Sequence, residues 1–354
     1  MMNLNKEKID SITLNGQEDI LFALKRMDVL ERKLLIILQG KRFVGLISIG
    51  DLQRAIIKNL PMDTKVTELI RDDIKVARVD DAREKIKAEM VSERIECMPV
   101  VDFDDNLVDV IFWEDIVGGQ LELTQKLQIP VVIMAGGEGT RLKPLTNILP
   151  KPLIPIFNNT IIEDIMDQFV QAGCCEFYIS LNYKAEMIKN YLESLHNPNY
   201  KFHFFQEEKP SGTAGSLSLL KEIITSTFFV SNCDIIIEQD LAEVYEYHKT
   251  NRNDITVIAA LKHYKIPYGT LESGSNGILT SLSEKPEIIF KINSGVYLLE
   301  PHTLSMIPHN EFFHITDLIL RIKRRKGRVG IFPISEKSWK DYGLLENLPF
   351  IMKK

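Results

Sequence analysis

The spacing of apolar residues changes character along the chain, and the change falls in the polar stretch 119–129, GQLELTQKLQI. Before this stretch, short apolar runs of strand length alternate with helical patterns such as residues 17–28, where apolar side chains recur every three or four positions. Beyond it, apolar strands at 131–134 and 228–237 flank a helical pattern at 160–173. Strands separated by crossover helices are typical of a mainly parallel α/β domain.

The N-terminal part, residues 1–122, contains an internal repeat. Residues 33–52 align without a gap on residues 97–116, an offset of 64 positions. Each copy consists of an apolar strand, a polar turn, a second strand and an acidic residue that opens a helix, and the complete repeats span about 8–58 and 66–119. A repeat of this length seldom buries its own apolar face, so we expect the two copies to pack together as one module.

The two copies resemble a tandem pair of cystathionine-β-synthase (CBS) domains, an α+β module that often binds adenosine nucleotides. The ribose-binding pattern of that family is matched in the first copy by Gly45, Ser48 and Asp51, whereas the second copy keeps only the final aspartate, Asp115. The resemblance implies at most one intact nucleotide cleft, at a helix N-terminus that attracts phosphate. Alternatively, Asp51 is a simple helix N-cap and the module serves only dimer contacts.

The bulk composition limits the class of partner. A length of 354 residues favours two domains, or a domain with a large module, over one compact core. The net charge of −6 and a sequence pI of about 5.8 argue against a nucleic-acid-binding face. The basic run 323–328 is interpreted as the solvated end of a helix.

Cysteine usage and apolar run lengths are typical of a cytoplasmic protein. No pair of cysteines has CxxC spacing, which favours neither a metal site nor a disulfide framework; they are Cys97, Cys174, Cys175 and Cys233. Residues 1–14 have no apolar core of signal-peptide length, and no segment reaches membrane-spanning length. We therefore expect a cytoplasmic location without membrane contact.

A glycine-rich loop, AGGEGTRLKPLTNILPKP, follows the apolar run at 131–134 and covers residues 135–152. It lacks the third glycine of a dinucleotide-binding turn and the Gly-Lys-Ser/Thr of a Walker loop, and its prolines exclude a long following helix. Glycine permits close backbone approach, and Arg141 and Lys151 can neutralise several phosphate oxygens. Such a loop suits a triphosphate that is to be split.

This loop resembles the signature of the sugar-1-phosphate nucleotidyltransferases, G-G-x-G-T-R-L-x-P-L-T followed by P-K-P. The resemblance extends from Ile129 to about Pro349 and implies a Rossmann-like nucleotidyltransferase domain over residues 128–354. In that family Arg141 and Lys151 would hold the triphosphate, and Arg141 would help pyrophosphate leave. The implied nucleotide-binding residues of the loop are Ala135, Gly136, Gly137, Gly139 and Thr140.

Two aspartates are candidate magnesium ligands. Asp234 lies at the end of the strand 228–237, and acidic residues on the ligand edge of a parallel sheet are placed to hold Mg²⁺. The resemblance implies that Asp234 is one ligand and that Asp341, in the W-x-D-x-G motif at 339–343, is the second. The alternative interpretation of Asp341 is a turn residue before glycine, and Tyr342 departs from the usual pattern of the motif.

The segment 207–217, EEKPSGTAGSL, resembles the part of the family that reads the base. Backbone at Gly212, the adjoining Thr213 and the side chain of Glu207 would then contact the nucleotide. A carboxylate accepts hydrogen bonds only, which matches the N1–H and amino donors of guanine. This favours GTP as the substrate, although Glu208 could take the same role.

Three short motifs would line the sugar pocket of the family. Lys285 would hold the sugar 1-phosphate as a catalytic residue, and Glu284 and Asn293 would meet the sugar hydroxyls, beside Gly269 and Gly295. Taken singly, these residues are ordinary turn residues at strand ends.

The whole chain resembles bacterial guanylyltransferases that make GDP-glucosamine from glucosamine 1-phosphate for legionaminic acid synthesis. The resemblance implies a Mg²⁺-dependent enzyme with GTP and a sugar 1-phosphate as substrates, assembled as a homodimer. Two alternatives stay open: mannose-1-phosphate guanylyltransferase, and a non-catalytic regulatory subunit. An adenosine nucleotide at the N-terminal module could tune the transferase.

Overall fold

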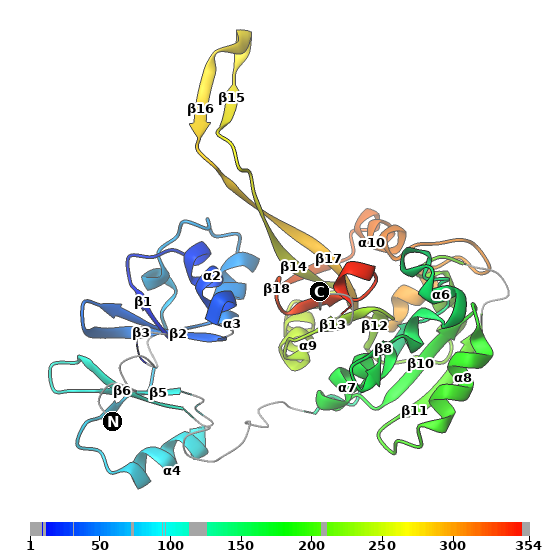
Figure 1. Ribbon diagram of the computed structural model, residues 1–354, viewed down its shortest axis with the longest axis horizontal. Helices are drawn as coiled ribbons and strands as arrows, with labels where there is room; N and C mark the ends of the chain where they lie inside the picture. The colour runs from blue at the N-terminus through cyan, green and yellow to red at the C-terminus, as the bar shows by residue number, and fades with distance from the viewer. Residues whose placement is uncertain are drawn as a thin grey trace. The chain divides into compact units, whose positions relative to one another are not determined.

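Two compact units make up the chain, Met1–Leu123 and Thr124–Lys354 (Figure 1). The computed structural model describes residues 9, 12–30, 32–71, 74–93, 95, 97–112, 126–206 and 211–348. None of the helices within these ranges is both long and apolar enough to cross a bilayer. Each unit has its own sheets and core.

The first unit contains the same arrangement of strands twice. The first copy comprises β1 (Thr13–Asn15), α2 (Ile20–Leu30), β2 (Leu34–Gln39), β3 (Arg42–Ser48) and α3 (Ile49–Ile57). The second comprises β4 (Ala77–Arg78), α4 (Arg83–Glu93), β5 (Cys97–Val101) and β6 (Leu107–Phe112). In both sheets the short first strand pairs parallel with the second strand, and the second pairs antiparallel with the third.

The two copies share a core. One cluster of buried apolar side chains draws Ile36 from the first copy and Cys97 and Val110 from the second. The backbones also meet, because the N–H of Leu107 donates to the carbonyl of Lys41 at 3.0 Å. Each copy therefore covers apolar surface that the other would leave exposed.

The second unit is built on a seven-stranded sheet in the order β11-β10-β7-β12-β17-β14-β18 (Figure 1). Four of the neighbouring pairs are parallel, and β17 is antiparallel to both of its neighbours. The strands are β7 (Val131–Met134), β10 (Glu176–Leu181), β11 (Lys201–Gln206), β12 (Phe228–Asn232), β14 (Ile255–Lys265), β17 (Glu287–Leu299) and β18 (Val329–Ser335). This confirms the predicted α/β fold with a mainly parallel sheet.

Helices follow the strands as crossover connections, and the residues at 131–133 are fully buried, as in a sheet covered on both faces. The main helices are α7 (Ile161–Gln171), α8 (Ala185–Ser194), α9 (Leu241–Thr250) and α10 (Ile315–Arg324). The helix expected at 160–173 is α7, which opens with a capping box between Thr160 and Glu163. Three small two-stranded sheets complete the unit: β8 (Pro155–Ile156) with β9 (Asn159–Thr160), β13 (Ile235–Ile237) with β19 (Trp339–Asp341), and β15 with β16.

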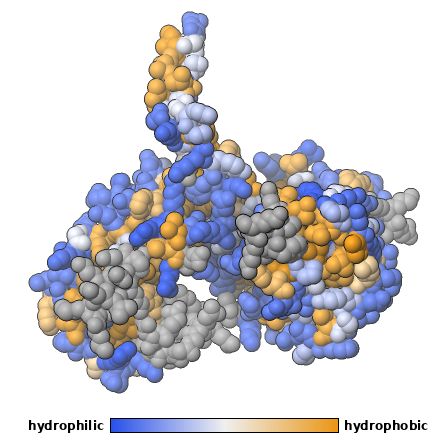
Figure 2. Space-filling model, in the orientation of Figure 1, coloured by the Kyte–Doolittle hydropathy of each residue, from blue (hydrophilic) through white to orange (hydrophobic). Residues whose placement is uncertain are grey.

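A long hairpin projects from this sheet. The strands β14 and β17 continue into β15 (Thr270–Ser273) and β16 (Leu279–Ser283), which pair with each other beyond the body of the unit (Figure 1). Large apolar side chains are exposed along it, and they colour much of the hairpin in Figure 2. Leu271, for example, is 67% exposed. The hairpin is therefore not part of the hydrophobic core.

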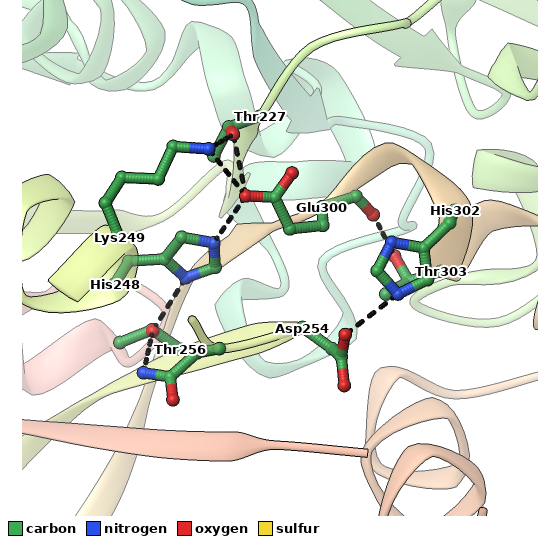
Figure 3. Close-up of polar contacts among 9 residues, drawn as sticks. Thr227, His248, Lys249, Asp254, Thr256, Glu300, His302 and Thr303 are labelled. Carbon is green, nitrogen blue, oxygen red and sulfur yellow. Dashed lines mark hydrogen bonds and ion pairs between the residues drawn. The ribbon is translucent and has the colours of Figure 1, made fainter. Parts of the chain in front are cut away.

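A network of polar side chains lies at the end of the sheet where β12 and β14 begin and β17 ends (Figure 3). The fully buried His248 contacts Thr256 Oγ1 through Nδ1 at 2.8 Å and Glu300 Oε1 through Nε2 at 3.3 Å. Lys249 donates to the same carboxylate at 2.7 Å. Burial lowers the pKa of His248 although Glu300 opposes the shift, so the neutral imidazole is the form that the fold accommodates.

Candidate active site

The glycine-rich loop folds back on itself after β7. It contains three short helical turns, Thr140–Leu142, α6 (Leu145–Ile148) and Lys151–Leu153, and no long helix follows β7. Gly139 has φ +63°, and a Cβ there would lie 2.9 Å from Thr146 Cγ2 and 3.0 Å from Lys151 Cβ. Thr146 also donates to the carbonyl of Gly139 at 3.0 Å. Glycine is therefore required at 139, and its close packing brings Lys151 back to the beginning of the loop.

Both cations of the loop approach Asp234, which lies between β12 and β13. The ammonium of Lys151 forms an ion pair with Asp234 Oδ2, and both side chains are nearly buried, at 11% and 6% exposed. The Nη2 atom of Arg141 lies 3.9 Å from the same oxygen, but 61% of the arginine side chain is exposed. Lys151 is thus enclosed with Asp234, whereas most of the Arg141 side chain is accessible to a ligand.

The strand pair β13–β19 brings Asp341 to the same place. Ile235 lies opposite Asp341 in the register, and the N–H of Tyr342 donates to the carbonyl of Asp234 at 2.9 Å. A Cβ on Gly343 would lie 2.8 Å from Asp341 Oδ1 and less than 3.0 Å from Asp234 Oδ2. These two carboxylate oxygens are therefore less than 5.8 Å apart, the greatest separation that the two distances allow.

The carboxylates of Asp234 and Asp341 fit the magnesium ligands that the sequence predicts. No group of three or more His, Cys, Asp or Glu side chains suited to a metal occurs among the residues that the structure describes. A metal held here would take its other ligands from phosphate oxygens and water. Mg²⁺ commonly binds in this way, through one or two carboxylates together with substrate phosphates.

Gly343 is a candidate site residue that the sequence motifs did not single out. A Cβ at this position would also come within 3.2 Å of Arg141 Nη2, so the glycine faces three of the four charged side chains. The glycine of the W-x-D-x-G motif was the available signal. Two of its three contacts, with Asp234 and Arg141, are 109 and 202 positions away in the sequence and cannot be predicted from the motif alone.

Asn293 and Gly295, predicted in the sugar pocket, lie near this centre. Gly295 has φ +91°, and a Cβ there would meet Asn232 Nδ2, at the end of β12, at 2.5 Å. Asn293 Oδ1 accepts from the N–H of Gly295 at 3.1 Å. The indole of Trp339, on the strand of Asp341, donates to the carbonyl of Ser294 at 3.1 Å. This part of β17 therefore borders the strand ends that carry the two aspartates.

The other predicted sugar-pocket residues lie on the projecting hairpin. A Cβ on Gly269 would meet Glu284 Oε2 at 2.9 Å, so these two positions are adjacent, and Glu284 and Lys285 are exposed. Glu287, which pairs with Lys265, is six residues from Asn293 along the continuous strand β17, or about 20 Å at ~3.3 Å per residue. The structure does not bring Lys285 to Asn293, and a shared sugar pocket requires the hairpin to bend.

The predicted base-reading segment contacts the loop before α10. Gly212 has φ +82°, and a Cβ there would lie 2.7 Å from the carbonyl oxygen of Phe313. The hydroxyl of Thr213 accepts from the N–H of Ile315 at 3.1 Å, so this side chain caps α10. Glu207 and its competitor Glu208 lie outside the described residues.

In the first unit, Ser48 and Asp51 form a capping box at the start of α3. Asp51 is 7% exposed and also accepts from Arg54 and from Arg71 Nε, the latter at 2.8 Å. Burial would raise the pKa of Asp51, but the hydrogen bonds from Arg71, Ser48 and Arg54 outweigh it and lower the pKa. The N-cap is therefore Ser48, not Asp51 as the alternative interpretation had it, and Asp51 is the third helical residue of the capping box with both oxygens engaged. A Cβ on Gly45 would collide with Ile70. Asp115 of the second copy lies outside the described residues.

Comparison with known proteins identifies the class of protein to which this chain belongs. The chain belongs to the nucleotidyl transferase family, whose model matches residues 130–353. The mannose-1-phosphate guanylyltransferase catalytic subunit beta of Drosophila melanogaster is 32% identical over 182 residues, which cover 50% of this chain and 49% of that protein. Mannose-1-phosphate guanylyltransferase 1 of Arabidopsis thaliana is 34% identical over 184 residues, covering 50% and 51%. The chain thus spans about half the length of these relatives.

Among solved structures, HddC from Yersinia pseudotuberculosis complexed with GMP-PN is similar to this chain with a TM-score of 0.50 and 26% identity. The match covers 62% of this chain and 96% of that chain.

Proposed function

We propose that this protein transfers the guanylyl group of GTP to a sugar 1-phosphate, giving a GDP-sugar and pyrophosphate. The observation that carries the proposal is the gathering of Arg141, Lys151, Asp234 and Asp341 beside Gly343. Family membership, the guanylyltransferases among the relatives and the guanine nucleotide analogue named with HddC all support it.

The reaction needs positioning and charge neutralisation more than proton transfer. A phosphate oxygen of the sugar 1-phosphate forms a bond to the α-phosphorus, and the bond from that phosphorus to the bridging oxygen of the β-phosphate breaks. The attacking oxygen is already anionic, so no general base is required. Arg141 and Lys151 offset charge on the triphosphate, and the exposed Arg141 can follow the departing pyrophosphate. Mg²⁺ bound by Asp234 and Asp341 would supply further charge neutralisation at the α-phosphate.

For the acceptor we propose glucosamine 1-phosphate, for a GDP-sugar used in legionaminic acid synthesis, on the sequence resemblance described above. Mannose 1-phosphate is the second candidate, because the named relatives are mannose-1-phosphate guanylyltransferases. The two sugars differ at C2, so the ratio of their kcat/KM values reports directly on the contacts made there.

A panel of the four nucleoside triphosphates against glucosamine, mannose and glucose 1-phosphates, followed by pyrophosphate release, tests the proposal. We expect turnover with GTP and a clear preference for one acceptor. Absence of pyrophosphate release with every pair, by folded protein in the presence of Mg²⁺, would reject the enzyme and favour the regulatory subunit.

For the first unit we propose a tandem CBS module over residues 1–122 that mediates homodimer contacts and binds an adenosine nucleotide at Gly45, Ser48 and Asp51. Support comes from the repeated sheet topology and from the half-exposed Arg54 and Arg71 beside the N-terminus of α3. A nucleotide there would have to compete with these arginines for Asp51.

A further inference from the structure

The short helix α6, between Arg141 and Lys151, is held by a lysine from another part of the chain. Lys184 Nζ donates to the carbonyl oxygens of Ile148 at 2.7 Å, Asn147 at 2.8 Å and Thr146 at 3.4 Å. The last carbonyls of a helix lack partners within it. A lysine that donates to them satisfies these acceptors, and its charge matches the negative end of the helix.

Tyr183 contacts the same loop at two points. Its hydroxyl donates to the carbonyl of Thr146 at 3.0 Å, and its backbone N–H donates to the carbonyl of Gly136 at 3.3 Å. Tyr183 and Lys184 follow β10, in which Ser180 pairs with Met134 at the end of β7. Both loops therefore leave the sheet at the same edge, and this pair of residues ties one to the other.

The backbone of Lys184 indicates that its side chain is needed for this role. Lys184 has φ +51°, a left-handed conformation that glycine adopts freely and lysine does not. It is also the N-cap of α8, where Ser, Thr, Asp or Asn is favoured, yet its side chain makes no capping hydrogen bond. Lys184 is therefore an unfavourable residue for both its backbone conformation and its N-cap position, and its ammonium instead donates to the carbonyl oxygens of α6. Retained strain of this kind is a pointer to function.

The contact reaches the phosphate-binding cations through Thr146, which is 1% exposed. Its carbonyl accepts from Tyr183 and Lys184, while its hydroxyl donates to Gly139, which packs against Lys151. Because the ammonium of Lys184 already contacts three carbonyl oxygens, it acts on the loop and not on a substrate.

We propose that Tyr183 and Lys184 are positioning residues that hold the glycine-rich loop in its nucleotide-binding conformation, a proposal that rests on the function above. Without this tie the loop must be ordered at the moment GTP binds, so the loss falls on binding more than on chemistry. We expect Lys184→Met to raise KM for GTP roughly tenfold and to change kcat less than about threefold.

Three variants at Lys184 separate positioning from stability. Lys184→Met removes the donors and keeps the strained backbone, Lys184→Gly removes the donors and the strain, and Lys184→Arg keeps a donor of similar reach. We expect the KM increase in the first two, most of the wild-type KM in the third, and no fall in Tm for Lys184→Gly. Lys189→Met, on the same helix, is the matched control and should leave KM and kcat unchanged.

Hydrogen–deuterium exchange of residues 136–149 in the ligand-free protein gives a readout that needs no activity. We expect faster exchange in Lys184→Met and Lys184→Gly than in the wild type and Lys189→Met. Wild-type exchange together with wild-type KM in these two variants would overturn the proposal, as would a KM increase that appears only with a general loss of Tm. If the wild type releases no pyrophosphate, the proposed function fails; the calorimetric Kd for GTP then replaces KM, and unchanged Kd would overturn the positioning role as well.

Discussion

Replacing Gly343 by alanine should reduce catalysis without unfolding the protein. The new Cβ would lie 2.8 Å from Asp341 Oδ1 and still closer to Asp234 Oδ2, whereas real Cβ atoms essentially never approach a neighbour below 3.0 Å. Both carboxylates must therefore retreat by several tenths of an ångström. Asp234 has little room to do so, because its side chain is 6% exposed and already paired with Lys151.

The expected fall in kcat is estimated from the sensitivity of catalytic rates to the position of catalytic groups. Misplacement of a reacting group by about 1 Å can lower the rate ~100-fold. For a smaller displacement of two ligands we expect kcat to fall about 10-fold to 100-fold, equivalent to about 1.4 to 2.7 kcal/mol in activation free energy. The assay is pyrophosphate release at saturating GTP and sugar 1-phosphate, with Tm measured on the same preparation.

Gly173→Ala is the matched control for Gly343→Ala. Gly173 has φ +93°, and its Cβ would lie 2.8 Å from the carbonyl oxygen of Leu127, which belongs to none of the predicted site residues. This variant should lower the free energy of unfolding by about 1 to 3 kcal/mol and leave kcat per folded molecule unchanged. Wild-type kcat in Gly343→Ala, or a fall in kcat that merely follows the fraction folded, would refute the assignment of Asp234 and Asp341 to one centre.

Three further predictions concern single side chains. Asp234→Asn should lower kcat per folded molecule at least about 100-fold, and it should also lower Tm because the nearly buried Lys151 loses its charged partner; near-wild-type turnover in pyrophosphate release would reject its role. Because burial lowers the pKa of His248 from 6.5, stability is fully present above that ordinary value and is lost as the pH falls toward the lowered one. Urea unfolding at about pH 7 and about pH 5 should therefore show a smaller loss for His248→Gln than for the wild type, and equal losses would contradict this. An adenosine nucleotide that binds at Asp51 should raise Tm with concentration, and no shift at any concentration would remove the proposed cleft.

The strand at 131–134 and the helix at 160–173 of the transferase unit were predictable because their apolar patterns are strong. The run at 131–134 is long enough to be a buried strand, and the prolines after it exclude a long helix whatever the tertiary context. The strand predicted at 228–237 is correct only in its first part, because β12 ends at Asn232 and Ile235–Ile237 form β13 in a separate two-stranded sheet. Asp234 lies in the turn between them, beyond the carboxyl end of β12, which is parallel to β7. The local pattern of apolar residues and prolines was therefore sufficient to predict the strand at 131–134 and the helix at 160–173.

The hairpin could not be predicted in the same way. The segment 266–286 is rich in glycine, serine and proline, and its turn chemistry is compatible with either an extended hairpin or a loop folded onto the sheet. Only tertiary contacts distinguish these, and most of its apolar side chains are exposed. The positions of Glu284 and Lys285 depend on whether the segment is an extended hairpin or a folded loop. The short motif that contains them could therefore not predict where they lie.

Asp51 shows the opposite difficulty, because its local pattern has two physical meanings. An aspartate three residues after a serine satisfies both a capping box and a ribose-binding motif. Its partner Arg71 lies 20 residues further along the chain. The Gly-x-Ser-x-x-Asp motif does not show whether an arginine far away in the sequence, such as Arg71, already pairs with the aspartate.

The ion pair with Lys151 explains how the candidate site can keep the carboxylate of Asp234 buried. A carboxylate that is 6% exposed is costly unless paired, and removal of one partner of a buried pair costs about 3–5 kcal/mol. The side chains of Arg141, Lys151, Asp234 and Asp341 together carry no net charge. A triphosphate that binds here therefore requires additional positive charge. The carboxylates of Asp234 and Asp341 are suited to bind that charge as Mg²⁺ that arrives with the nucleotide. On the proposed function, Lys151 exchanges its carboxylate partner for a phosphate oxygen when the nucleotide binds, so we expect the same residue both to stabilise Asp234 and to bind the substrate.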